Sequence, residues 1–469
     1  MKIQIKFPVF IRAAILVAAL ALMPGRLVAQ SPDQGLVAHE WGTFTSFQAA
    51  DGVLLKWRTL AASGLPAFVV HYNQPGPGLY ALGDPVLTPP KAEIYSLQRM
   101  ETPVVYFYSH TNQTVDVRVN FPHGLITEWY PAASQYGPSH PAVTRDGSHS
   151  PDYIPGTDSA TSMIRWNGLR ILPVAESKDT GAWRIMGCGS SPIAPAAGST
   201  DASAYFPQDK SGSHYFAARE TDANPVVTGP GTLSAAPETE KFLFYRGVGN
   251  FATPLVVTMP SDDVLTVENK GKETLARVFV VGARDGVAGF ADIGELKPGV
   301  RNAVPLNFWQ PASAREQMEA QLSEAMKQAL VAQGLYAREA EAMVKTWKDS
   351  WFGEEGVRVL YLLLRQWTDQ TLPMQLNPVP RELVRVMVGR AEVLAPATER
   401  SLAVLLPKVR DNDSGAAAEV GKILNRLGRF AEPAYQRVSA GMEIGKMDEA
   451  TQARLRAPLD RVEEQIARR

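Results

Sequence analysis

The chain has 469 residues, of which 45% are hydrophobic, 47 are basic, 48 are acidic and one, Cys188, is a cysteine. This length favours two or three domains with sizeable cores, and the near-neutral charge argues against nucleic acid or an anionic membrane surface as the partner. A single cysteine excludes an intramolecular disulfide, so we expect Cys188 to be a small buried residue in a tight turn rather than a reactive thiol.

Residues 1–30 have the three parts of a secretory signal. A basic start is followed by the apolar run 13–23, and Leu27 to Ala29 offers a small residue at a cleavage position. Removal of this segment takes away four basic residues and no acidic one, which changes the formal net charge from −1 to −5. The apolar run is too short to span a bilayer. We therefore expect export to the periplasm or the cell exterior, without a transmembrane segment in the mature chain and without a nucleic-acid partner.

The first strand of the mature chain is predicted at residues 36–47, LVAHEWGTFTSF. Neighbouring residues of a strand point to opposite faces. His39 and Glu40 are therefore expected on opposite sides of the sheet, so they could bind one ion together only across a bulge.

Two further strands are predicted around a short polar loop. The run 104–108, VVYFY, is apolar on both faces, whereas residues 115–121 alternate strictly between apolar and polar. Such a pair is typical of a hairpin, with the first strand inside the sheet and the second nearer an edge or a solvated face.

More strands are predicted at 162–172, 182–186 and 241–251, between loops rich in proline and glycine at 73–90 and 130–158. Residues 254–308 contain short strands at regular spacing and are expected to form an immunoglobulin-like sandwich. Residues 282–286 are predicted to be a turn between two of these strands.

The composition changes at Pro311. Ser313 and Glu316 have the spacing of a capping box, and the helix that they begin is expected to end at Gln333, before Gly334. A second helix is predicted at 337–351, strands at 357–364 and 384–388, and a helical region from about residue 397, with pieces at 416–428, 431–440 and 448–467.

The predicted fold is mainly β, sandwich-like and antiparallel, followed by an α-helical C-terminal region, and is α+β overall. The expected divisions are a signal peptide at 1–30, a β-rich domain at 31–252, a sandwich-like segment at 253–310, a mixed segment at 311–396 and the helical region at 397–469.

Chemistry that uses histidine is expected in the first half of the chain, because all seven histidines precede residue 215. The catalytic candidates are His39, Glu101, His214, Arg219 and Glu220. Of these, His39, His214 and Glu220 could also ligate a divalent metal such as zinc. The competing interpretation is that each is a satisfied polar residue at a strand end.

Two acidic segments raise the same question. If residues 219–222 form a strand, Glu220 and Asp222 share one face and could bind a cation. Alternatively, they belong to an ordinary solvated strand edge on which the carboxylates pair with arginine. Glu354 and Glu355 lie at a predicted helix-to-strand junction, where they could face a cleft or belong to a polar linker.

Five stretches resemble an uncharacterised family of exported bacterial proteins: HEWGTFTS (39–46), METPVVYFYS (100–109), HYFAARETDA (214–223), KFLFYRGVG (241–249) and SWFGEEGVRVLYLL (350–363). The resemblance implies export and a bacterial origin, and it implies no activity.

Two functions follow as hypotheses. One is a binding or assembly protein of the cell envelope, with an envelope protein or a polysaccharide as its partner. The other is an exported hydrolase or lyase, metal-assisted in one version, that uses the histidines and carboxylates named above.

Overall fold

The structure is a computed structural model that describes residues 35–61, 64–72, 94–137, 162–172, 174–176, 183–185, 206–207, 213–229, 232, 234, 237–284 and 286–467. The predicted signal segment 1–30, Cys188 and the predicted loop 73–90 lie outside these residues.

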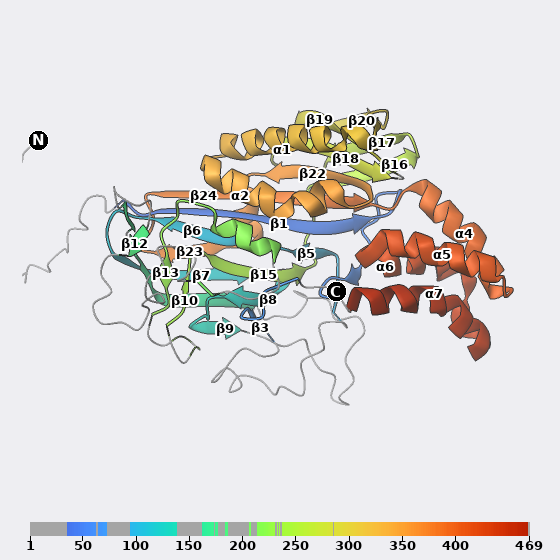
Figure 1. Ribbon diagram of the computed structural model, residues 1–469, viewed down its shortest axis with the longest axis horizontal. Coiled ribbons are helices and arrows are strands. Elements are labelled where there is room, and N and C mark those ends of the chain that lie inside the picture. Colours follow the sequence, from blue (N-terminus) through green and yellow to red (C-terminus); the bar gives the residue numbers. More distant parts are fainter. Residues whose placement is uncertain are drawn as a thin grey trace, which may run out of the picture. The chain divides into compact units, whose positions relative to one another are not determined.

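A large mixed sheet runs through the described residues (Figure 1). Its strands are β1 (Val37–Gln48), β3 (Val70–His71), β5 (Gln98–Met100), β6 (Val104–Tyr108), β8 (Gly124–Tyr130), β15 (Leu243–Gly249), β18 (Leu275–Arg284), β19 (Val287–Leu296), β21 (Gln310–Pro311), β22 (Gly356–Leu363) and β24 (Glu382–Val393). The long strands β1 and β24 run parallel to each other at its centre, and the other pairings are antiparallel. Every residue of β1 is buried, as expected for a strand that is covered on both faces.

A second sheet covers one face of the central sheet. It contains β7 (Gln113–Phe121), β9 (Gln135–Gly137), β10 (Ser162–Ile171), β13 (Val226–Val227), β14 (Thr239–Glu240) and β23 (Met374–Asn377). Val117 and Trp166 of this sheet share one apolar core with Phe44 and Tyr245 of the central sheet. The two sheets therefore form the sandwich-like part of the molecule, which confirms the predicted α+β class.

Helices cover the other face of the central sheet. They are α1 (Arg315–Ala332), which packs against β19, and α2 (Ala337–Lys348), which lies over β22 and β24 in Figure 1. Met326 of α1 and Met343 of α2 pack with Trp41 of β1 and Leu360 of β22 in a second core. A short 3₁₀ helix, η5 (His214–Arg219), also packs against α2.

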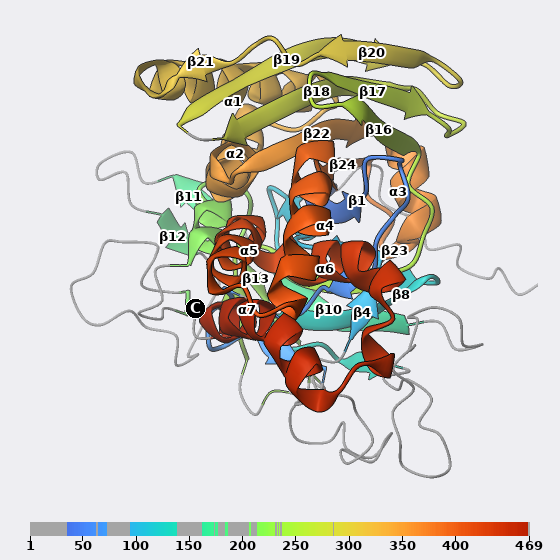
Figure 2. The same ribbon diagram turned by 90° about the vertical axis from the view of Figure 1, so that its right-hand side faces the viewer.

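The C-terminal helices lie at one end of the strands of the central sheet (Figure 2). They are α4 (Pro396–Arg410), α5 (Ser414–Leu427), α6 (Ala431–Ser439) and α7 (Glu449–Ala467), with the 3₁₀ turn η8 (Gly428–Phe430) before α6. Phe430 stacks on Phe47, the penultimate residue of β1, with ring centroids 4.7 Å apart, and this contact joins the helices to the sheet. Among the helices of the described residues, none has the length and apolar character needed to cross a bilayer.

The remaining strands and the remaining α-helix are short. They are the three-stranded sheet of β16 (Leu255–Ser261), β17 (Val264–Asn269) and β20 (Arg301–Pro305), the strand pairs β2 (Trp57–Arg58) with β4 (Tyr95–Ser96) and β11 (Val174–Glu176) with β12 (Trp183–Ile185), and the helix α3 (Arg365–Thr371). The predicted immunoglobulin-like sandwich at 254–308 is wrong, because β18 and β19 join the central sheet while β16, β17 and β20 pair with one another.

Two local predictions also need correction. The runs 104–108 and 115–121 form strands with the predicted burial, yet they do not form a hairpin: β6 pairs with β1 and β15, and β7 pairs with β10 and β23. Alternation shows which face of a strand is buried and does not identify its neighbour. The helix α1 begins at Arg315 with Ala314 as its N-cap and no side-chain cap, so Ser313 and Glu316 do not form a capping box.

Strands from three of the predicted segments share the central sheet. β1 belongs to the segment 31–252, β18 and β19 to 253–310, and β22 and β24 to 311–396. The boundaries drawn from composition are therefore not boundaries between sheets.

Candidate functional site

His39 lies on β1 with its ring completely buried against the start of α2. Its Nδ1 is 2.8 Å from Oε2 of Glu339, and the Tyr108 hydroxyl donates to Oε1 of the same carboxylate at 2.7 Å. Burial and the Glu339 carboxylate raise the pKa of Tyr108. The ring of the exposed Tyr336 lies 4.4 Å from the His39 ring, measured between ring centroids. These contacts tie β1 to the first turn of α2.

Glu101 follows β5 and is buried in a different place, near the C-terminal helices. Its Oε1 accepts from Arg429 at 2.7 Å and from Thr45 at 3.2 Å, and its Oε2 lies 2.9 Å from Nε of Arg99. Burial alone would raise the pKa of Glu101. The guanidinium groups of Arg99, Arg429 and Arg246 outweigh burial and lower it to about 2. At neutral pH Glu101 is therefore an ionised partner for these arginines.

His214 and Glu220 lie at the molecular surface at the two ends of η5. The His214 ring packs on Trp347 and Tyr215, while the residue stays exposed. Loss of solvent on the packed side lowers the pKa of His214. Glu220 forms an ion pair with Lys345, and both side chains are half-exposed.

The structure therefore does not bring the predicted metal ligands His39, His214 and Glu220 together. Within the described residues, no group of three or more histidine, cysteine, aspartate or glutamate side chains is arranged to hold a metal ion. Residues 214–219 form a 3₁₀ helix instead of a strand, so the predicted shared face of Glu220 and Asp222 does not exist. Glu220 and Asp222 form separate surface ion pairs, with Lys345 and Arg338 respectively.

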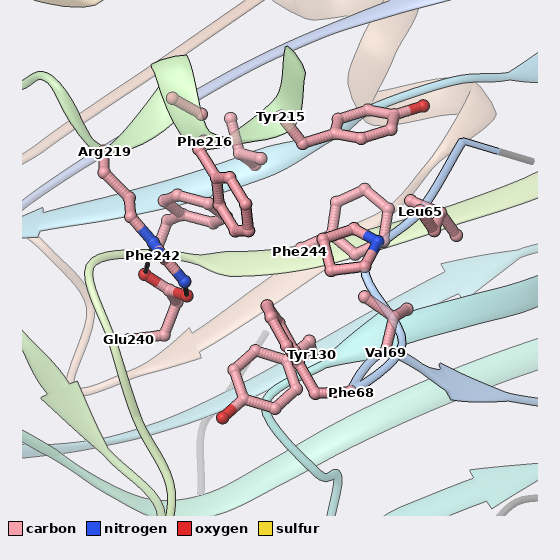
Figure 3. A pocket seen from close by; sticks show the side chains of 13 residues that line it. Leu65, Phe68, Val69, Tyr130, Tyr215, Phe216, Arg219, Glu240, Phe242 and Phe244 are labelled. Carbon is pink, nitrogen blue, oxygen red and sulfur yellow. Dashed lines mark hydrogen bonds and ion pairs between the residues drawn. The ribbon is translucent and has the colours of Figure 1, made fainter. Parts of the chain in front are cut away.

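Arg219 lines an aromatic pocket between η5 and β15 (Figure 3). The pocket is lined by Leu65, Pro66, Phe68, Val69, Val104, Tyr130, Tyr215, Phe216, Ala218, Arg219, Glu240, Phe242 and Phe244. At one end Arg219 donates to both oxygens of Glu240, at 2.6 and 3.0 Å, and its guanidinium lies 4.6 Å from the centre of the Phe216 ring. Burial raises the pKa of Glu240, although Arg219 opposes this effect.

The aromatic pocket has little free space. The space is about 30 Å³, which is room for roughly one or two water molecules. The side chains that form the pocket therefore fill it, and the pair of Arg219 and Glu240 closes one end. In this form the pocket is part of the packing between η5 and the central sheet.

A much larger opening lies between the end of the central sheet and the C-terminal helices. We call it the sheet–helix cleft, and its volume is about 410 Å³. Its lining residues are Phe47, Met259, Asp262, Ala283, Arg284, Glu355, Gly356, Val357, Glu392, Val393, Ala395, Ala397, Thr398, Ser401, Leu405, Glu419, Ile423, Arg426, Leu427 and Phe430. The volume lies within the range of about 300–1,000 Å³ that is typical of ligand pockets.

One wall of the sheet–helix cleft contains a buried carboxylate that is fully neutralised. Glu392 on β24 accepts from Arg358 at 2.9 Å and from Arg390 at 2.7 Å, and Arg390 also donates to Glu354 at 2.6 Å. Gly356 leaves room for this carboxylate because it has no side chain: a Cβ there would lie 2.5 Å from Oε1 of Glu392. Its positive φ also favours glycine at this position. Hydrogen bonds from both arginines hold the Glu392 carboxylate in place in the wall.

Two charges on the rim of the cleft are not neutralised. Glu355, directly before β22, is exposed, and its carboxylate has no partner among the described residues. Arg284, the last residue of β18, is exposed and stacks on Trp309 at 4.4 Å without an ion pair in the described part of the chain. The cleft therefore combines apolar side chains such as Leu405 with one charge of each sign that has no ion-pair partner among the described residues.

The sequence identified part of this arrangement. Glu355 was predicted to lie at a helix-to-strand junction that could face a cleft, and the structure places it in the lining of the sheet–helix cleft. Arg284 was missed because residues 282–286 have the composition of a turn, whereas β18 extends to Arg284. The helical side of the cleft had no sequence signal, because its residues, such as Ser401 and Leu405, are ordinary for amphipathic helices.

No protein family model matches the sequence, and no curated protein matches it. Among solved structures, the yeast delta-COP-I mu-homology domain complexed with a Dsl1 WxWxV peptide is 8% identical, with 77% of this chain and 96% of that chain covered and a TM-score of 0.22. The yeast delta-COP-I mu-homology domain alone is also 8% identical, with 77% and 98% covered and a TM-score of 0.24. Overlaps of this quality support no inference about this chain.

Proposed function

We propose that this protein is an exported binding protein of the cell envelope, and that the sheet–helix cleft holds a segment of a partner protein. The observation that carries the proposal is the cleft itself, which has a volume of about 410 Å³ and lies between the end of the central sheet and the C-terminal helices. The sheets act as the scaffold, and the C-terminal helices form the second contact surface.

The lining of the cleft favours a peptide segment as the ligand. Apolar groups such as Val357, Leu405 and Leu427 can bury an apolar side chain of the partner. Glu355 and Arg284 can pair with charged groups that remain at the rim. A segment with an apolar anchor and flanking charges would satisfy both parts of the lining.

Filling the cleft should weaken partner binding without unfolding the protein. Ser401 lines the cleft on α4 and is exposed, so Ser401→Trp places a large side chain in the opening without displacing a core residue. We expect the affinity for cleft-binding peptides to fall at least about tenfold, because the added ring occupies the space that the ligand needs. Fluorescence polarisation with labelled peptides, selected from a library on the wild-type protein, measures this change.

The matched control is Val404→Trp. Val404 lies on the same helix, is 60% exposed and is not part of the cleft, so the added ring should leave binding unchanged. The proposal would be abandoned if the selected peptides bound Ser401→Trp as tightly as the wild type, or if both tryptophan variants lost binding equally.

Export is a separate part of the proposal, supported by the composition of residues 1–30. When the full chain is produced in a Gram-negative host, we expect it in the periplasm or the medium, shortened by about the first 29 or 30 residues, as determined by intact mass. The double substitution Leu16→Arg and Leu20→Arg interrupts the apolar run and should leave a full-length protein in the cytoplasm. A wild-type protein of full-length mass in the cytoplasm would refute export.

A further inference from the structure

The outer face of the second sheet contains a directly opposed pair of arginines. Arg118 on β7 and Arg165 on β10 are direct partners in the antiparallel register. Directly opposed residues on one face have Cβ atoms about 4.5–5.5 Å apart, and like charges in this position destabilise a sheet. Neither guanidinium forms an ion pair with a described residue; Nε of Arg118 donates to Asn120 at 3.2 Å.

The two arginines are the centre of a polar row that crosses four strands. Gln135 of β9 is the partner of Arg165 on its other side, and Gln375 of β23 is the partner of Arg118. Paired residues of neighbouring strands point to the same face. The row therefore presents two guanidinium groups at its centre, with one long amide side chain on each side of them.

A hollow of about 190 Å³ lies over this part of the sheet. It is lined by Asp116, Val117, Arg118, Arg165, Gln375, Leu376 and Asn377. Asp116 and Asn377 are direct partners and form a second polar row beside the first. One oxygen of Asp116 accepts from the backbone of Gly168 at 2.8 Å, which holds the carboxylate in place.

We propose that this hollow binds an acidic saccharide, with the sugar carboxylate held between Arg118 and Arg165. Guanidinium groups match a planar carboxylate through two parallel hydrogen bonds, and a bound anion would relieve the repulsion between the arginines. Asp116, Gln375 and Asn377 supply acceptors and donors for sugar hydroxyls. The hollow is smaller than a drug-sized pocket and suits one sugar ring.

The same residues disfavour a phosphate group as the ligand. Asp116 places a negative charge beside the arginines, so the hollow suits an anion with a single charge and neighbouring hydroxyl groups. A uronic acid has this chemistry, whereas inorganic phosphate at neutral pH carries more charge and no hydroxyl-bearing ring.

The test compares D-galacturonate, its neutral methyl ester and inorganic phosphate on the full mature chain, by saturation-transfer NMR and titration calorimetry. We expect galacturonate to bind and to weaken as ionic strength rises, because the pair is solvated. The methyl ester should bind at least about tenfold more weakly, since the carboxylate makes the charge-assisted contacts. Phosphate should also bind more weakly than galacturonate.

The variants Arg118→Gln and Arg165→Gln should each weaken galacturonate binding at least about tenfold. Arg170→Gln is the matched control, because Arg170 lies on the same strand β10, is exposed and is outside the hollow. It should bind as the wild type does. The midpoint temperatures of the two hollow variants should equal or exceed that of the wild type, since each substitution removes a like-charge contact.

Four results would overturn the proposal: no binding of galacturonate by the wild type, equal binding of the acid and its ester, tighter binding of phosphate, or an unchanged affinity in Arg118→Gln and Arg165→Gln. The result is independent of the sheet–helix cleft, because Ser401→Trp should leave galacturonate binding intact. Failure of one proposal is therefore distinguishable from failure of the other.

Discussion

Replacing Glu40 by alanine should lower the free energy of unfolding by about 3–5 kcal/mol. Glu40 lies on β1 with a completely buried side chain, where it accepts from the Tyr245 hydroxyl at 2.5 Å and from Nε of Arg385 at 2.7 Å. The variant leaves the Arg385 guanidinium buried with Asp369 as its remaining charged partner. A buried charge without compensation is the costly state, because its lost hydration is not replaced. Denaturant unfolding followed by circular dichroism measures the change.

Two controls distinguish the cost of leaving a buried charge unpaired from the cost of losing any ion pair. Glu220→Ala removes the half-exposed pair with Lys345 and should change the stability by no more than about 1 kcal/mol. The double variant Glu40→Ala, Arg385→Met removes both charges and should be less destabilised than Glu40→Ala alone. Equal losses for Glu40→Ala and Glu220→Ala would show that the interior of the sheet tolerates the unpaired arginine.

Glu101→Gln should be strongly destabilising at neutral pH, and the loss should fade in acid. The folded protein holds the pKa of Glu101 at about 2, against about 4.5 in the unfolded chain. A carboxyl group whose pKa is lower in the folded state stabilises the protein at pH values above its pKa in the unfolded state. This contribution is lost as the pH falls through its pKa in the folded state. The shift corresponds to about 3 kcal/mol at pH 7. The window of the loss is therefore pH 4.5 to 2.

The measurement is the stability of wild type and Glu101→Gln at several pH values. The difference should be near its full size above pH 5 and should shrink between pH 4.5 and 2, as the wild-type carboxylate is protonated beside Arg99 and Arg429. Thr45→Val is the control, because it removes one neutral hydrogen bond to the same carboxylate and should cost about 1 kcal/mol. A difference that stays constant down to pH 2 would contradict the role of the arginines.

The sequence could predict what depends on neighbours along the chain. Strict alternation at 115–121 predicted which side chains of β7 are buried, and the same rule placed His39 and Glu40 on opposite faces of β1. The helix α1 ends at Ala332, one residue before the predicted end, and Gly334 follows its C-cap Gln333 with a φ of +101° that favours glycine. These features follow from backbone geometry and side-chain burial over a few residues.

The tertiary structure alone decided which segments meet. Periodicity could not show that β6 and β7 belong to different sheets, or that β1 pairs in parallel with β24. It could not identify Arg385 as the partner of Glu40, because 345 residues separate the two in the chain.

The same division applies to the sites. The sequence by itself determined the α+β class, the buried faces of the strands and the types of polar residue available. The sheet–helix cleft and the arginine pair of the second sheet arise from packing between elements that are distant in sequence. Pairing of strands and helices is fixed by the shape and volume of the whole core, and no local pattern contains that information.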